Sequence, residues 1–179
     1  MNFKYLNELE RNLEIQANSF ILQKEDSLFE SQTRTEFNQI LLVNRLKSQI
    51  GKFTKVYLSD LSLFGEIIEI SMDHLVVEEN GFKYLLKVNQ ILYLENLTNW
   101  NCNITRFEEK WNFKSSLRDL LLKKTIIQIK ITNGQILLGY INNCFNDHFD
   151  LMTDCKSISI QTNHLLWIKF KDNAENSTE

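Results

Sequence analysis

The chain has 179 residues, enough for one ordinary domain or two very small ones. Its hydrophobic share of 43% can build a core, and its formal net charge of −3 excludes the global basic field of many nucleic-acid-binding proteins. No apolar run approaches the length of a membrane span, and the first residues do not look like a secretory signal. The three cysteines Cys102, Cys144 and Cys155 are too scattered for a disulfide framework, so we expect a cytoplasmic protein.

Residues 1–40 are predicted to form a helical arm. Apolar residues recur there at steps of three and four, which is the period of one helix face. A capping-box pattern from Ser27 to Glu30 interrupts this period, so the arm is either two helices or one long kinked helix. Both an ordinary packing helix and a dimerising coiled coil fit the pattern.

From Gly51 onward the apolar period becomes two, which indicates β-strands. Five short strands with tight connections favour a small barrel, because closure removes exposed sheet edges. We therefore predict a first barrel over residues 41–98, with Asn80-Gly81 as one of its hairpin turns. Its strand patterns cover 52–58, 62–70, 74–79, 82–88 and 91–94.

A linker over residues 99–114 leads to a second barrel over 115–171, and residues 172–179 are expected to be a disordered tail. Ser116 can cap a short helix at the start of this second set. Asn133-Gly134 is its strongest hairpin signal, because both residues accept positive φ. The predicted fold class is mainly β with α: an N-terminal helical arm followed by two five-stranded β-barrels.

The two sets of strands are a tandem repeat. Equivalent residues lie 74 positions apart, and the offset becomes 73 upstream of Gly65 because the first hairpin is one residue shorter. An insertion in a hairpin loop is what a repeated domain tolerates. The matching pairs include Gly65 with Gly139, Asp73 with Asp147, His74 with His148, and Asn89 with Asn163.

The stretches "IGKFTKVYLSDLSLFGEIIEISMDHLVVEENGFKYLLKVNQILYL" and "LKKTIIQIKITNGQILLGYINNCFNDHFDLMTDCKSISIQTNHLLWI" resemble Sm-like barrels, which are small SH3-like β-barrels preceded by a helix. The arm followed by two such stretches is similar to uncharacterised actinobacterial proteins of about this length. The Asp and Asn of the first Sm motif are replaced here by Ser71 and Leu75, and in the second repeat by Phe145 and Phe149. Uridine binding as in Sm proteins therefore does not carry over.

The repeated Asp-His pairs, Asp73-His74 and Asp147-His148, are interpreted as turn architecture, because Asp in a turn accepts hydrogen bonds from nearby amides. A catalytic or metal-binding role is the alternative. Asn89 and Asn163 are expected in equivalent short turns, where they either cap the turn or contact a nucleic-acid base. Gly65 and Gly139 complete this set of architectural residues.

A zinc site is a further alternative, because Cys144, His148, Cys155 and His164 supply ligand types that suit zinc. Their spacing lacks a close cysteine pair, so we predict no metal and no cofactor.

A basic and aromatic segment lies between the two sets of strands. Residues 104–130 hold seven basic against three acidic residues, whereas residues 51–98 hold four against seven. Aromatic side chains interleaved with bases either stack nucleobases or pack a linker onto its neighbours. The candidate nucleic-acid-binding residues are Trp100, Arg106, Phe107, Lys110, Trp111, Lys114, Lys123 and Lys124.

No phosphate-binding loop, nucleophile elbow or pair of catalytic carboxylates is recognisable, so we predict that the protein is not an enzyme. We expect a non-catalytic binding or scaffold module that acts through barrel edges and the helical arm. Its partner is either an unknown protein or a second copy that associates through edge strands. The alternative is an RNA-binding or ribosome-associated factor that uses the basic segment 104–130.

Overall fold

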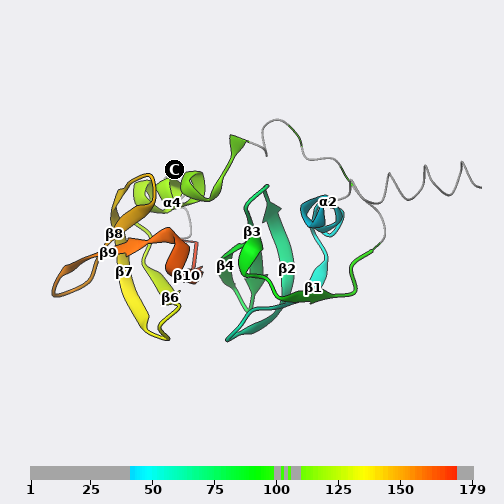
Figure 1. The fold of residues 1–179 in the computed structure, drawn as a ribbon, viewed down its shortest axis with the longest axis horizontal. Helices are drawn as coiled ribbons and strands as arrows, with labels where there is room; N and C mark the ends of the chain where they lie inside the picture. The colour runs from blue at the N-terminus through cyan, green and yellow to red at the C-terminus, as the bar shows by residue number, and fades with distance from the viewer. Residues whose placement is uncertain (1–40, 99–101, 103–104, 106–109, 173–179) are drawn as a thin grey trace, which may run out of the picture. The chain divides into compact units, whose positions relative to one another are not determined.

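A computed structural model describes residues 41–98, 102, 105 and 110–172. Ten strands form one antiparallel sheet in the order β5-β1-β2-β3-β4-β10-β6-β7-β8-β9 (Figure 1). Strands of the first set are β1 (Phe53–Tyr57), β2 (Ser62–Ile70), β3 (His74–Glu79), β4 (Phe82–Lys87) and β5 (Tyr93–Glu95). Those of the second are β6 (Ile127–Ile131), β7 (Ile136–Cys144), β8 (His148–Met152), β9 (Ser157–Gln161) and β10 (Leu165–Phe170).

A short helix precedes each set of strands. α2 (Leu42–Lys47) buries Val43 and Leu46, and α4 (Phe113–Leu122) buries Phe113, Leu117 and Leu120. Each set also contains one turn of 3₁₀ helix before its last strand, η1 (Val88–Gln90) and η2 (Thr162–His164). Neither described helix is long and apolar enough to cross a membrane.

The start of α4 differs from the prediction. The helix begins at Phe113, and its cap is Asn112, whose side chain accepts a hydrogen bond from the Ser115 N–H at 3.1 Å. Ser116 therefore lies inside the helix and not at its cap. Asn112 takes this role because its side-chain oxygen reaches an amide of the first turn, which otherwise has no partner within the helix.

The prediction of two closed five-stranded barrels is wrong. Within the described residues, β5 pairs with β1 alone, and the outer edge of β4 is paired with β10 of the other set. Strand β5, which would have to pair with β4 to close the first barrel, has only three residues. Strand β10 pairs with β4 over four residues, from Trp167 opposite Leu86 to Phe170 opposite Lys83. The outcome is an open sheet. The predicted helical arm lies outside the described residues.

The tandem repeat is confirmed in the topology. Each set places its last strand beside its first, followed by its second, third and fourth strands. Irregular register interrupts β2 between Ile67 and Glu69, and it interrupts β7 between Ile141 and Asn143, which lie 74 residues later. The sheet is therefore two copies of one unit, joined where β4 meets β10.

The two predicted hairpin turns differ in backbone conformation. Asn80 and Gly81 both have positive φ, at 53° and 77°. In the other turn Gly134 has a φ of 88°, while Asn133 is absent from the described residues with positive φ. The Asn133 side chain instead accepts a hydrogen bond from the Gln135 N–H at 2.9 Å, an Asx turn that stabilises the loop without positive φ at Asn133.

Each repeat has its own hydrophobic core, and strands at the junction serve both: Val76 of β3 and Leu85 of β4 lie in the core of the second repeat. The residues Leu165 and Ile168 of β10 belong to the core of the second repeat. Leu166 and Trp167 of the same strand belong to the core of the first. Trp167 is 7% exposed and meets Tyr84 edge to face, with ring centroids 6.1 Å apart. Burial of apolar side chains on both faces of β10 therefore holds the repeats together.

Gly65 and Gly139 occupy equivalent positions that no larger residue can fill. A Cβ atom added at Gly65 would lie 2.2 Å from the backbone oxygen of Glu78, and one at Gly139 would lie 2.2 Å from that of Met152. Real Cβ atoms do not approach so closely, and a backbone oxygen in a sheet cannot move aside cheaply. The close approach explains why each repeat has a glycine here.

We predict that Gly139→Ala lowers the free energy of unfolding by at least about 2 kcal/mol, because β7 and β8 must separate locally. Gly134→Ala is the control, since nothing lies within 4 Å of the added Cβ and only positive φ opposes it, at about 1 kcal/mol. Urea unfolding followed by circular dichroism measures both. Equal losses in the two variants would contradict the steric explanation.

Candidate functional site

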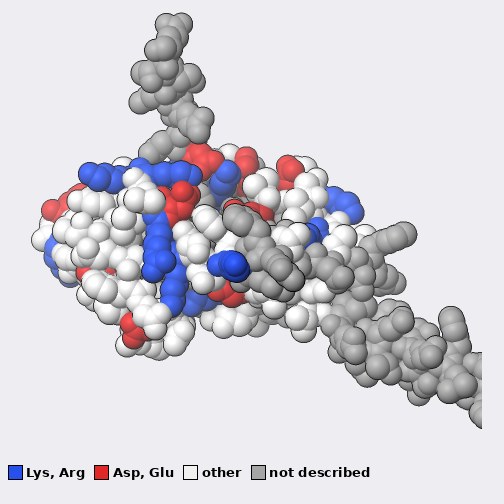
Figure 2. All heavy atoms as spheres, turned by 90° about the horizontal axis from the view of Figure 1, so that it is seen from above, with Lys and Arg blue, Asp and Glu red and all other residues white. Residues whose placement is uncertain are grey.

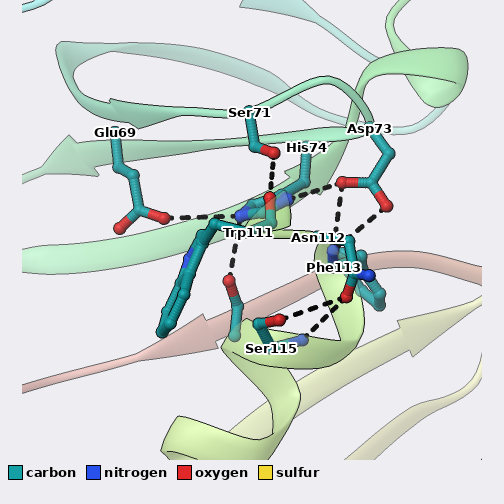
Figure 3. A network of polar contacts seen from close by, with 9 residues as sticks. Glu69, Ser71, Asp73, His74, Trp111, Asn112, Phe113 and Ser115 are labelled. Atoms are coloured by element: carbon teal, nitrogen blue, oxygen red, sulfur yellow. Dashed lines mark hydrogen bonds and ion pairs between the residues drawn. The ribbon is translucent and has the colours of Figure 1, made fainter. Parts of the chain in front are cut away.

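A polar network joins the first repeat to the start of α4 (Figure 3). Asp73 and His74 lie at the β2–β3 turn, and Glu69 lies near the end of β2. Three contacts bind this turn to the segment before and within α4. The Asp73 carboxylate accepts the Phe113 N–H at 3.0 and 3.1 Å, Ser71 Oγ donates to the Trp111 carbonyl, and Ser116 Oγ lies 2.9 Å from His74 Nε2.

His74 is the centre of this network. Its ring is 0% exposed, and Nδ1 donates to Asp73 Oδ1 at 2.8 Å. Nε2 faces both Ser116 and, at 3.5 Å, a carboxylate oxygen of Glu69. A buried imidazole between two carboxylates is stabilised in its protonated form, since the paired charges offset the cost of removing it from water.

The pKa shifts follow from this geometry. Burial alone would lower the pKa of His74, but the hydrogen bond to Asp73 and the negative charges of Asp73 and Glu69 outweigh burial and raise that pKa. Burial would raise the pKa of Asp73, but the hydrogen bonds from His74 and the Phe113 amide lower it. The His74 imidazole likewise lowers the pKa of Glu69 against the opposing effect of burial.

The order Ser116, His74, Asp73 is that of a nucleophile, a base and an orienting acid. A general base must be neutral to accept a proton, whereas the second nitrogen of His74 already faces the Glu69 carboxylate. The ring is also inaccessible to a substrate, at 0% exposure. The arrangement is better suited to anchor α4 on the first repeat than to activate Ser116.

Lys87 extends the contact between the repeats. Its Nζ donates to the Thr162 carbonyl in η2 and lies 4.9 Å from the centroid of the Phe113 ring. Burial lowers the pKa of this lysine. The first repeat thus holds α4 and η2, which both belong to the second.

The second repeat keeps the Asp-His pair without the surrounding network. His148 Nδ1 lies 2.7 Å from Asp147 Oδ1, but the two side chains are 37% and 75% exposed. Phe145 stands where the first repeat has Ser71, and its ring stacks on His148 with centroids 4.5 Å apart. The same local turn is therefore buried in one repeat and open in the other.

Both Asp turns share one backbone contact. The Asp73 carbonyl accepts the Val88 N–H at 2.9 Å, and the Asp147 carbonyl accepts the Thr162 N–H at 2.8 Å. Each turn is thereby tied to the 3₁₀ helix of its own repeat. Asn89 and Asn163 lie in η1 and η2 with exposed side chains, and the caps of these helices, Lys87 and Gln161, make no capping hydrogen bond.

The four residues of the alternative zinc site are not arranged to hold a metal ion. Within the described part of the chain, no group of three or more His, Cys, Asp or Glu side chains is arranged to hold a metal ion. Cys155 is exposed and Cys144 is half-buried.

The predicted nucleic-acid-binding residues divide into three groups. Trp100, Arg106 and Phe107 lie outside the described residues. Trp111 and Lys114 make contacts within the protein, to Ser71 and Asn146 respectively. Lys110 and Lys124 are exposed, and the exposed Lys123 forms an ion pair with Asp119 at 2.8 Å. On the face in Figure 2, basic and acidic side chains are interspersed among uncharged areas. RNA binding stays a prediction.

A groove lies beside β9, at one end of the sheet. It has a volume of about 710 Å³, and polar residues such as Thr132, Gln161 and His164 line part of it. Sequence analysis did not find this groove, because its walls come from two hairpins that only the fold brings together. Its apolar lining consists of Ile131, Ile136, Leu137, Ile158 and Ile160.

Comparison with models of known protein families and with curated proteins finds no match to this chain. The resemblance to actinobacterial proteins accordingly stays a prediction.

We predict that His74 makes stability depend on pH in a defined direction. A raised pKa contributes stability that is fully present below the unfolded value of about 6.5 and is lost as pH rises through the folded pKa. The lowered pKa values of Asp73 and Glu69 contribute stability that is present above about pH 4 and is lost as pH falls through their folded values. The network is thus strongest between about pH 4 and 6.5.

His74→Gln should lower the free energy of unfolding by about 2 kcal/mol near pH 6 and by less near pH 9, because hydrogen bonds to a charged partner are lost. Chemical denaturation across this pH range measures the difference. His148→Gln, at the equivalent position in the second repeat, is the matched control and should cost less stability near pH 6, because His148 and Asp147 are 37% and 75% exposed. An identical loss at every pH in His74→Gln would contradict the charged network.

Proposed function

We propose that this chain is a non-catalytic binding module that captures an extended polypeptide strand at the β9 edge of its sheet. The observation that carries the proposal is the junction inside the molecule. The fourth strand of the first repeat, β4, is covered by β10, whereas no strand covers β9, the fourth strand of the second repeat, within the described residues.

The uncovered edge offers backbone groups for pairing. β9 pairs with β8 on one side, from His148 opposite Gln161 to Met152 opposite Ser157. Its other side carries the N–H and C=O groups that an antiparallel or parallel strand would use. Main-chain hydrogen bonds supply affinity in this mode of recognition, and pockets for alternate side chains supply specificity.

The groove beside β9 supplies such a pocket. Ile158 and Leu137 are only partly buried against the core of the second repeat, and Ile136 is 50% exposed. In the first repeat, the residues equivalent to Ile158 and Leu137 are Tyr84 and Leu63, which are 7% and 0% exposed. An added strand with apolar side chains would complete the burial that the first repeat already has.

The site geometry also supports a binding function over catalysis. The one Ser-His-Asp arrangement among the described residues is buried and holds its imidazole between two carboxylates. The groove at β9 is lined by isoleucines, leucine and uncharged polar residues, with Lys156 and His164 as its ionisable members. It offers apolar contact and backbone pairing, which suit capture of a strand.

A labelled peptide of residues 163–170 tests the proposal, because this strand fills the corresponding place in the first repeat. Fluorescence anisotropy should show saturable binding to the full chain at low chain concentration. Ile158→Asp should weaken it at least about tenfold, since a charge would be buried in the groove.

Two controls accompany this measurement. A peptide with Ser in place of Leu166 and Trp167 should bind at least about tenfold more weakly, because it cannot fill the groove. Phe64→Asp changes a residue that is 59% exposed and is not part of the groove, so it should leave binding unchanged. Absence of binding, or equal binding by the Ile158→Asp chain, would refute strand capture at β9.

A further inference from the structure

The last strand of each repeat shows two faces that behave differently. In β10, Leu165 and Ile168 pack into their own repeat, and Leu166 with Trp167 pack into the first repeat. The equivalent inward pair in the first repeat is Ile91, which lies between η1 and β5, and Leu94 of β5; both pack against the core of their own repeat. The equivalents of Leu166 and Trp167 are Leu92 and Tyr93, which are 64% and 55% exposed.

The strand equivalent to β10 in the first repeat, β5 with the residue before it, therefore exposes the two apolar side chains whose equivalents β10 buries in a neighbouring repeat. Leu92 and Tyr93 lie at the β5 end of the sheet, and the groove lies at the β9 end. Exposed large apolar side chains side by side are costly in water unless a partner covers them. Tyr93 already stacks on Tyr57, with centroids 4.1 Å apart, so its ring is held in place before any partner arrives.

The groove is lined by residues equivalent to those of the first core. The first core, to which Trp167 belongs, also includes Leu58, Tyr84 and Leu86. Their equivalents in the second repeat are Ile131, Ile158 and Ile160, and all three line the groove. The molecule thus contains the paired β4–β10 junction, the exposed strand β5, which is equivalent to β10, and the open groove beside β9, which is equivalent to the β4 side of that junction.

We propose that β5 of one copy of this chain pairs with β9 of a second copy, with Leu92 and Tyr93 inserted into the groove. The inference rests on the proposed capture of a strand at β9 and names its partner. The β4–β10 junction sets the register: Trp167 opposite Leu86 becomes Tyr93 opposite Ile160, and Lys169 opposite Tyr84 becomes Glu95 opposite Ile158.

The association is head to tail. Because β5 and β9 lie at opposite ends of the sheet, each copy uses one surface to bind and a different surface to be bound. Such a heterologous contact leaves one unused β5 and one unused β9 in every dimer, so further copies can add. Complementary variants can therefore identify it.

The test uses two variants of the full chain, each with one surface disabled. Tyr93→Asp removes the inserting side chain at a site that is 55% exposed, and Ile158→Asp blocks the groove. In analytical ultracentrifugation the wild type should gain mass as its concentration rises, and each variant alone should stay monomeric. Mixed in equal amounts, they should form dimers and nothing larger, because each pair retains one intact junction.

Control variants distinguish loss of the binding surface from misfolding of the chain. Ile136→Asp, at a groove residue that is 50% exposed, should act as Ile158→Asp does, and far-ultraviolet circular dichroism should show both folded. Phe64→Asp, outside the groove, should self-associate as the wild type does.

The outcomes distinguish this inference from the proposed function. A wild type that stays monomeric at high concentration, while the 163–170 peptide still binds, overturns head-to-tail association and leaves strand capture standing. Failure of both measurements overturns both. Variants that self-associate alone, or a mixture that gains no mass, also overturn the proposed contact.

Discussion

The pairing of β4 with β10 joins the two halves of the molecule. It joins two repeats into one sheet, and it lets Leu166 and Trp167 of the second repeat complete the core of the first. The Trp167 Nε1 is buried without a hydrogen-bond partner among the described residues, a cost that apolar packing must exceed. Removing this junction would expose apolar surface on both sides, so neither repeat is a self-sufficient barrel.

The two repeats have diverged at their shared Asp-His turn. In the first repeat the turn, with Glu69 and Ser71, holds the segment from Trp111 to Ser116. In the second, Phe145 covers His148, and the turn stays open to solvent. The first repeat is thus specialised for contact within the chain, while the second presents the uncovered β9 edge and its groove. The junction that one repeat uses inside the chain is thus left uncovered, within the described residues, at the equivalent edge of the other.

Much of the fold could be predicted from local patterns. The strands at 62–70 and 74–79 lie where alternation and turn residues indicated. The prediction of closed barrels was wrong. Closure depends on which strand forms the most favourable pairing with the edge of β4, and the strand that does so, β10, lies some 80 residues away in the sequence. The Ser116 cap was also wrong, because the earlier Asn112 makes the better contact with the first turn.

Local patterns were sufficient to predict the repeat, several of the strands and the two equivalent glycines, because these features depend on neighbours within one hairpin. The close strand approach at these glycines, the open sheet, the place of His74 between Glu69 and Asp73, and the groove lined by isoleucines from two hairpins became visible only in the fold. These features depend on contacts between segments that are far apart in the sequence. The free energy of such contacts comes from burying strand and helix faces against partners that a local pattern does not identify.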